Sequence, residues 1–128
     1  MCGILAYITS KQINPNKILR IKNLMKCRGP DDQSYKKILF GKKNLHLFHS
    51  RLSIQDLNKR SNQPYIFKDY ILIFNGEIYN FKELKENLNK KFRTSSDTEV
   101  ILYYYFLYKE KCFELFEGMW SIVIYDKK

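Results

Sequence analysis

Residues 96–108 constrain the fold of this chain more than any other segment. Ser96 is followed three residues later by Glu99, a capping-box pattern that predicts the start of a helix. The side chains that follow, as far as Tyr108, are almost all apolar or aromatic and would lie on every side of that helix. A helix that is hydrophobic all round is buried. The rest of the chain must therefore provide layers that cover it.

Length and composition are sufficient for such layers. The chain has 128 residues, of which 45% are hydrophobic and 16% aromatic, so we expect one globular domain with a substantial core. No apolar run is long enough to span a bilayer, and the first residues lack the pattern of a secretory signal. We therefore expect no membrane partner and a cytoplasmic location.

The cysteines agree with that location. There are three, an odd number without CxxC or metal-ligand spacing, which argues against a disulfide framework and against a zinc site. This fits a reducing compartment. We expect no metal and no cofactor, and we interpret Cys27 and Cys112 as inert core thiols.

The remaining patterns predict strands and helices that alternate along the chain. Ile18, Ile21 and Met25 fall on one helical face with Leu24 beside them, and Asn80 precedes a second helix as its N-cap. The predicted strands are residues 3–9 (buried), 35–40, 45–50, 71–74 and 119–125; the predicted helices besides 96–108 are 15–26 and 81–89, with a hairpin connection at 41–44, a loop at 28–31 and a long loop at 52–70.

The net charge of +10 raises the question of nucleic-acid binding. The 23 Lys and Arg residues are scattered, with no run longer than two, and no known nucleic-acid motif accompanies them. Charge alone supports only non-specific affinity. We expect no specific nucleic-acid partner.

Cys2 is the first candidate for chemistry. If Met1 is removed, this residue carries a thiol and a free α-amine together. An α-amine has a pKa of roughly 7.7–8.0 in peptides, so it can accept the thiol proton near neutral pH. That arrangement supplies an activated nucleophile without a histidine.

Asn75 and Gly76 are the second candidate. They follow a predicted strand, and the Gly76 N–H and the Asn75 amide could converge as an oxyanion hole at a strand-to-turn junction. The alternative is a type I′ hairpin turn, for which Asn-Gly is a strong signal.

Charged residues and histidines near strand and helix ends allow two interpretations each. Arg51 ends a strand and could clamp a carboxylate, or it could form a surface ion pair. Asp97 could pair with an ammonium group, or it could stabilise the first turn of its helix. His46 and His49 are more consistent with packing or hydrogen bonding than with ligand binding.

These segments occur in one order that resembles a known family. The chain resembles the class II glutamine amidotransferase domain of the N-terminal nucleophile hydrolases, and most of all the glutaminase domain of glutamine-dependent asparagine synthetases. The motifs that carry the resemblance are Met1-Cys2-Gly3-Ile4, Arg28-Gly29-Pro30-Asp31, His49-Ser50-Arg51-Leu52-Ser53-Ile54, Asn62-Gln63-Pro64, Asn75-Gly76-Glu77-Ile78-Tyr79-Asn80, Ser96-Asp97-Thr98-Glu99 and Gly118-Met119-Trp120-Ser121.

The resemblance implies a fold and a reaction. The fold would be α+β, a four-layer α-β-β-α sandwich of antiparallel sheets. Cys2 would attack the side-chain amide of L-glutamine, and water would release glutamate from the thioester. The implied site residues are Cys2, Asn75 and Gly76 for catalysis, Arg51 for the substrate carboxylate, Glu77 and Asp97 for its ammonium group, and Leu52, Ser53, Ile54 and Gln55 as pocket lining.

The chain departs from the family at two motif positions and in length. Cys27 and Ser50 stand where the family usually has a histidine and a glutamate. Residues 1–128 would form a glutaminase domain incomplete at its C-terminus, without the synthetase domain. We therefore expect either a glutaminase that passes ammonia to a separate synthetase subunit or self-associates, or an inactive glutamine-binding or interaction module.

Overall fold

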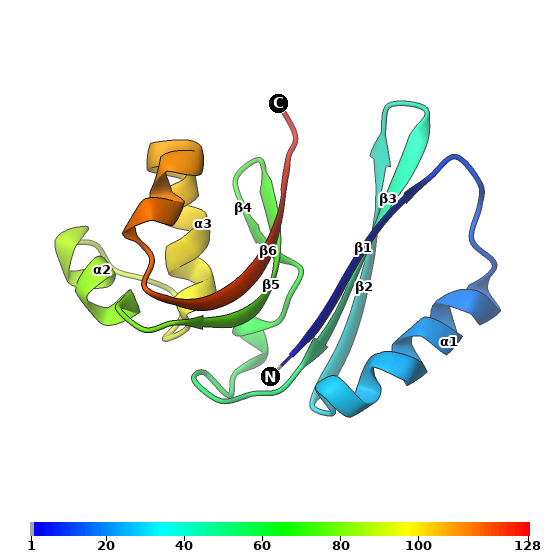
Figure 1. Cartoon of the computed structure of the whole chain (residues 1–128), viewed down its shortest axis with the longest axis horizontal. Coiled ribbons are helices and arrows are strands. Elements are labelled where there is room, and N and C mark those ends of the chain that lie inside the picture. Colours follow the sequence, from blue (N-terminus) through cyan, green and yellow to red (C-terminus); the bar gives the residue numbers. More distant parts are fainter. Residues whose placement is uncertain (1) are drawn as a thin grey trace.

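The computed structural model describes residues 2–128 (Figure 1). None of the helices in this part of the chain is both long enough and apolar enough to cross a membrane. The elements in order are β1 (Gly3–Thr9), α1 (Pro15–Met25), β2 (Asp32–Phe40), β3 (Lys43–Arg51), β4 (Tyr65–Phe67), β5 (Tyr70–Ile78), α2 (Phe81–Asn87), α3 (Asp97–Tyr108) and β6 (Gly118–Asp126), with short 3-10 helices at Lys26–Arg28, Lys59–Ser61 and Lys109–Leu115.

The strands form two antiparallel sheets of three strands each, in the orders β1-β3-β2 and β4-β5-β6. The β2–β3 hairpin turns at Gly41, whose φ of 59° favours glycine, so the predicted hairpin is confirmed with longer strands. In the first sheet Gly3 pairs with Ser50, which places the start of β1 beside the end of β3. Two antiparallel sheets with helices make an α+β fold, as expected.

The two sheets pack against each other through a small apolar cluster. Leu45 and Leu47 of β3 and Ile71 and Ile73 of β5 are its buried members. Figure 1 shows α1 on the outer side of the first sheet, and α2 and α3 on the outer side of the second. The polar end of the space between the sheets is where the candidate site lies.

The larger core surrounds α3. Val100, Ile101 and Leu102 have no exposed surface, which confirms the predicted buried helix. Ser96 caps α3 by accepting the N–H of Thr98 at 3.1 Å. The reciprocal bond of a capping box is not formed, because the Glu99 carboxylate instead accepts the N–H groups of Arg93 and Thr94.

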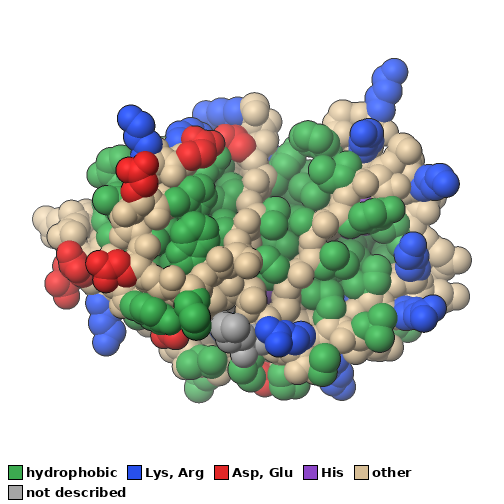
Figure 2. Space-filling view, in the orientation of Figure 1, with side chains coloured by type: hydrophobic (Ala, Val, Ile, Leu, Met, Phe, Trp, Pro, Cys, Tyr) green, Lys and Arg blue, Asp and Glu red, His purple; other side chains and the backbone are tan. Residues whose placement is uncertain are grey.

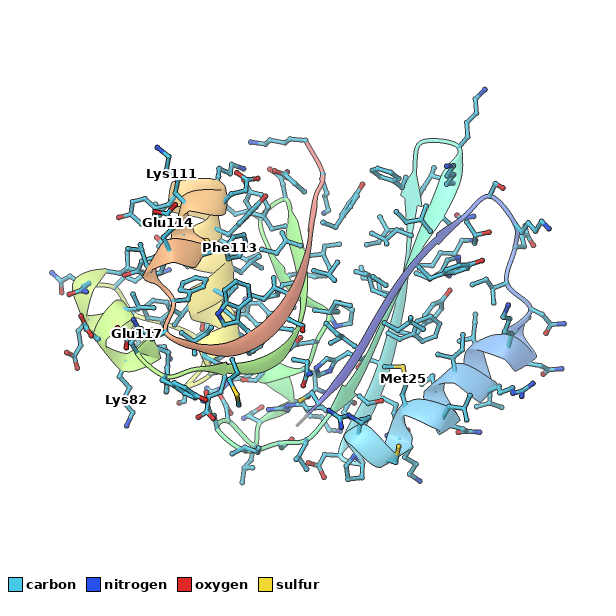
Figure 3. The ribbon with its side chains drawn as sticks, in the orientation of Figure 1. Met25, Lys82, Lys111, Phe113, Glu114 and Glu117 are labelled. Carbon is cyan, nitrogen blue, oxygen red and sulfur yellow. The ribbon has the colours of Figure 1, made fainter. Side chains whose placement is uncertain are left out.

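The helix α1 forms where it was predicted, and it is not buried. Asn14 caps it as its side chain accepts the N–H of Asn16 at 2.8 Å, but none of its residues is buried. Met25 points toward the first sheet in Figure 3, and its Cε would lie 3.5 Å from a Cβ on Gly3. Leu24, which lies beside this face of the helix, is 68% exposed.

Two predictions about burial are wrong, for β1 and for Cys27, because no other element within residues 2–128 covers them. The strand β1 lies at a sheet edge, so Tyr7 and Ile8 remain 45% and 49% exposed instead of buried. Cys27 is exposed, since it lies in the turn after α1. Asn80 is the N-cap residue of α2, as predicted, and its carbonyl oxygen accepts the N–H of Leu84 at 3.1 Å, but its side chain makes no capping bond and instead bonds Leu115 and Glu117.

The long loop predicted at residues 52–70 is partly structured, since it contains a 3-10 turn and the strand β4. The strand β5 extends beyond its prediction as far as Ile78, so Asn75 and Gly76 lie inside a strand. They form neither the strand-to-turn junction nor the alternative hairpin turn. Basic side chains are spread around the face shown in Figure 2 and form no continuous patch there.

Candidate functional site

A pocket of about 200 Å³ lies where the two sheets meet the start of α3. Its walls come from five regions: the residue before β1, the end of β3 with the loop that follows, the strand β5, the start of α3, and the start of β6. The lining residues are Cys2, Arg51, Leu52, Ile54, Gln55, Asp56, Ser61, Gln63, Phe74, Gly76, Glu77, Ser96, Asp97, Thr98 and Met119.

Cys2 is half-buried at the wall of this pocket. Its Sγ accepts the N–H of Leu52 at 3.3 Å and lies 3.7 Å from the Leu52 carbonyl oxygen. The pairing of Gly3 with Ser50 brings these residues together. Met1 lies outside the described residues, so its predicted removal, which would free the α-amine of Cys2, stays a prediction.

Arg51 is a buried cation of the pocket, only 7% exposed, which excludes the surface ion pair considered above. Its guanidinium donates to the carbonyl oxygens of Asn58, at 3.0 Å, and Asp56, and to Asn62 Oδ1 at 2.6 Å. The ion pairs found in residues 2–128 do not include it. A buried cation held by neutral groups favours an incoming anion.

Asp56 holds the loop that carries Arg51's partners. Its carboxylate accepts the N–H of Asn58 and of Ser95, both at 2.9 Å, and Nε of Arg60 at 3.2 Å. Burial acts to raise the pKa of Asp56, but these hydrogen bonds outweigh it and hold the pKa well below its ordinary value. Because Ser95 lies just before α3, Asp56 also attaches this loop to the start of α3.

Glu77 and Asp97 are the acidic residues of the pocket that come from β5 and α3. Asp97 is 5% exposed, and its Oδ2 accepts the N–H of Ile78 at 3.1 Å. Burial raises the pKa of Asp97 above its ordinary value. Asp97 is also the first residue of α3, so the helix-terminus role considered above and a place in the pocket coexist.

The side chain of Gln55 connects these two acidic residues. Its Nε2 donates to Glu77 Oε1 at 3.3 Å, and its Oε1 accepts the N–H of Asp97 at 3.2 Å. The sequence predicted Gln55 only as pocket lining. Gln63, whose side chain the sequence gave no role, acts similarly: it accepts the N–H of Phe74 at 2.6 Å and donates to Thr98 Oγ1 at 3.3 Å.

Gly76 lines the pocket in a backbone conformation that needs glycine. Its φ is 152°, and a Cβ at this position would collide with the Met119 carbonyl oxygen on β6. Neighbouring side chains of a strand point to opposite faces, and the Asn75 side chain is not among the lining groups. Ser53 is also outside the pocket, and its N–H binds Asp31 Oδ2 at 2.7 Å.

The two histidines of β3 are buried, as a packing role predicts. His46 Nδ1 lies 2.8 Å from the Tyr35 hydroxyl oxygen. Cys112 is fully buried, and burial raises the pKa of its thiol to about 12, so it is the inert core thiol that was expected. Within residues 2–128 no group of three or more His, Cys, Asp or Glu side chains is arranged to hold a metal ion.

Comparison with known proteins gives a consistent result. The family model described as "Glutamine amidotransferase domain" matches residues 1–128. The putative asparagine synthetase [glutamine-hydrolyzing] 2 of Methanocaldococcus jannaschii is 37% identical over 100% of this chain and 28% of its own length. The probable asparagine synthetase [glutamine-hydrolyzing] of Schizosaccharomyces pombe is 40% identical over 99% of this chain and 23% of its own length. The chain thus spans less than a third of either relative.

Proposed function

Because the chain belongs to the glutamine amidotransferase domain family, we propose that it hydrolyses the side-chain amide of glutamine to glutamate and ammonia through a thioester on Cys2. The observation that carries this proposal is the distribution of charge around the Cys2 sulfur. Arg51 supplies a cation on one wall of the pocket, and Glu77 and Asp97 supply anions on another. A free amino acid carries the opposite charges, one carboxylate and one ammonium group.

Substrate recognition follows from those walls. The α-carboxylate of glutamine binds Arg51, whose guanidinium is already held in place by neutral oxygens. Its α-ammonium binds Glu77 and Asp97, and the cation offsets the burial that raises the pKa of Asp97. Leu52, Ile54 and Gln55 form the segment along which the substrate lies, while Ser53 between them faces out of the pocket. The side-chain amide then extends toward Cys2.

The chemistry has two halves. With Met1 removed, the α-amine of Cys2 accepts the thiol proton, and the sulfur attacks the amide carbon. The Asn75 amide and the Gly76 N–H stabilise the tetrahedral oxyanion. The C–N bond breaks, the amine returns the proton to the leaving ammonia, and a thioester remains. Water attacks the thioester, and glutamate leaves as the Cys2 thiol is restored.

Several wider features belong to the same proposal. Two antiparallel sheets with helices on their outer sides support a four-layer α-β-β-α sandwich, the N-terminal nucleophile hydrolase fold, as the architecture of the domain. The ammonia would be used by a synthetase activity, as in the relatives named asparagine synthetase [glutamine-hydrolyzing]. Such an activity would lie in a separate subunit or in a further domain. We place the reaction in the cytoplasm.

Glutamate release by wild type and by Cys2→Ala tests the proposal. The amino terminus of each protein is first verified by mass. We expect the substitution to lower the rate of glutamine hydrolysis by about 10³-fold or more, because removal of a covalent nucleophile removes the pathway itself. Cys27→Ala is the matched control, since it removes an exposed thiol outside the pocket. A wild-type rate equal to that of Cys2→Ala would overturn the proposal.

A further inference from the structure

His49 on β3 and Asn75 on β5 are two buried polar side chains whose hydrogen bonds are incomplete. His49 is 1% exposed, and neither of its ring nitrogens makes a well-formed hydrogen bond within residues 2–128. The Asn75 Oδ1 atom is buried and also lacks one. An unsatisfied buried polar group destabilises the folded state, so two such side chains on neighbouring strands require an explanation.

The strand geometry makes these two side chains face each other. Leu47 of β3 and Ile73 of β5 belong to the apolar cluster between the sheets. His49 and Asn75 each follow one of these residues by two positions, and alternate residues of a strand share a face. His49 and Asn75 therefore continue the two facing rows by one step. In addition, the backbone of Phe74, next to Asn75, lies against the His49 ring and acts as a weak hydrogen-bond partner that raises the pKa of His49, which places this ring beside Asn75.

The His49 ring is neutral and therefore carries one N–H donor. Burial, the largest effect, lowers its pKa to about 4, so the ring is neutral at physiological pH. A neutral imidazole always has one N–H donor and one acceptor nitrogen. No direct hydrogen bond joins the two side chains in this structure, and the N–H can satisfy Asn75 Oδ1 through one buried water.

The orientation of the Asn75 amide matters for the reaction proposed above. An oxyanion can accept a hydrogen bond only from the Nδ2 end of the amide. With Nδ2 directed at the substrate oxygen, Oδ1 must face away and needs a donor there. Ser121 is opposite Asn75 on β6, but it is exposed and makes no hydrogen bond to Asn75. On the facing sheet, His49 supplies the missing donor.

We propose that His49 is a positioning residue of the oxyanion site, whose ring N–H holds Asn75 Oδ1 and so turns the amide nitrogen toward the substrate. This inference rests on the proposed glutamine hydrolysis. His49 acts through Asn75 and does not touch the substrate. Its effect therefore falls on the tetrahedral state and leaves substrate binding unchanged.

The test compares His49→Phe, which removes the donor, with His49→Gln, which keeps an N–H. We expect His49→Phe to lower kcat for glutamine by about 10–100-fold with KM within about twofold of wild type, which approaches the loss of an oxyanion donor. His49→Gln restores most of kcat. Ser121→Ala is the matched control and keeps wild-type kcat.

A second readout separates positioning from packing. The aldehyde analogue of glutamine forms a tetrahedral adduct with Cys2 whose oxygen occupies the oxyanion site, whereas glutamate binds without one. We expect His49→Phe to weaken aldehyde binding by the same factor as kcat and to leave glutamate binding unchanged. Equal weakening of both ligands, or wild-type kcat in His49→Phe, would overturn the inference.

The remaining outcomes are also decisive. If His49→Phe does not fold, the ring N–H signal of His49 in the wild type is measured by NMR. A shift in Asn75→Ala supports the contact, and no shift overturns it. A wild type that hydrolyses no more glutamine than Cys2→Ala instead overturns the proposed function. This comparison does not involve the His49 variants, so the two failures are distinguished.

Discussion

The two halves of the molecule use their helices in opposite ways. On the second sheet, α3 has seven buried residues, and four of them (Val100, Ile101, Leu102 and Tyr104) belong to a core that also includes β5 and α2. On the first sheet, α1 contributes none. Both segments were predicted as helices from their sequence patterns, and both are helices. The difference in burial comes from what surrounds each of them.

The candidate site lies where these unequal halves meet. Cys2 and Arg51 come from the first sheet, while Gly76, Glu77 and Asp97 come from the second sheet and α3. The acidic wall is therefore attached to the main core. The nucleophile wall depends on strand pairing, the contact of Cys2 with Leu52 and the hydrogen bonds of Arg51. We expect stability to depend mainly on the second half, and the geometry of the reaction on the connections between the halves.

The largest expected effect compares one leucine from each helix. Leu102 on α3 has no exposed surface, and Leu24 on α1 is 68% exposed. Leu102→Ala should lower the free energy of unfolding by about 3 kcal/mol, because it removes buried methyl groups and leaves a cavity. Leu24→Ala should change it by less than about 0.5 kcal/mol. Urea unfolding measures both, and equal losses would contradict the proposed difference between the halves.

A smaller effect is expected where the halves are joined. Asp56→Asn replaces a carboxylate that binds Asn58, Arg60 and the Ser95 backbone. We expect it to lower the free energy of unfolding by about 2 kcal/mol at neutral pH, in the range for hydrogen bonds to charged groups. Asp69→Asn, at a half-exposed surface ion pair, is the matched control and should cost less than about 1 kcal/mol.

The pH dependence of that difference gives an independent check. The folded pKa of Asp56 is held below its ordinary value of 3.8. Its contribution to stability is therefore present in full above the unfolded pKa and is lost as the pH falls toward and through the folded pKa. Acid unfolding of wild type and Asp56→Asn should show the two stabilities converging at low pH. If the stability difference between wild type and Asp56→Asn stays constant as the pH falls below the ordinary pKa of the carboxyl group, the carboxylate charge is not the cause of that difference.

Local patterns predicted the elements better than they predicted contacts. The burial of α3 follows from its own composition, and the β2–β3 hairpin follows from Gly41 and its flanking strands. The exposure of Leu24 and Tyr7 depends on which elements cover α1 and β1, and no local pattern carries that information. Burial needs a partner as well as an apolar side chain.

The site shows the same limit. The motif order predicted Cys2, Arg51 and Asp97, which the fold brings to one pocket. The bridging side chains Gln55 and Gln63 were missed as bridges, because their partners lie 42 and 35 residues away along the chain. Such contacts depend on how the loop after β3 is seated against α3. Glutamine occurs in loops for many reasons, so the residue type alone does not predict a bridging hydrogen bond.

The smallest expected effect concerns Gln55, which lies on the loop after β3 and bonds both Glu77 and Asp97 of the other half. Gln55→Ala removes one hydrogen bond to each, which is worth about 1 kcal/mol, so the KM for glutamine should rise by about three- to tenfold. We expect kcat to remain unchanged, because these residues bind the ammonium group equally in the ground and transition states. Gln33→Ala is the matched control, since its amide binds the Gly29 carbonyl outside the pocket. Steady-state kinetics distinguish the outcomes: a lower KM in Gln55→Ala would mean that the Gln55 amide occupies the ammonium position and is displaced by substrate.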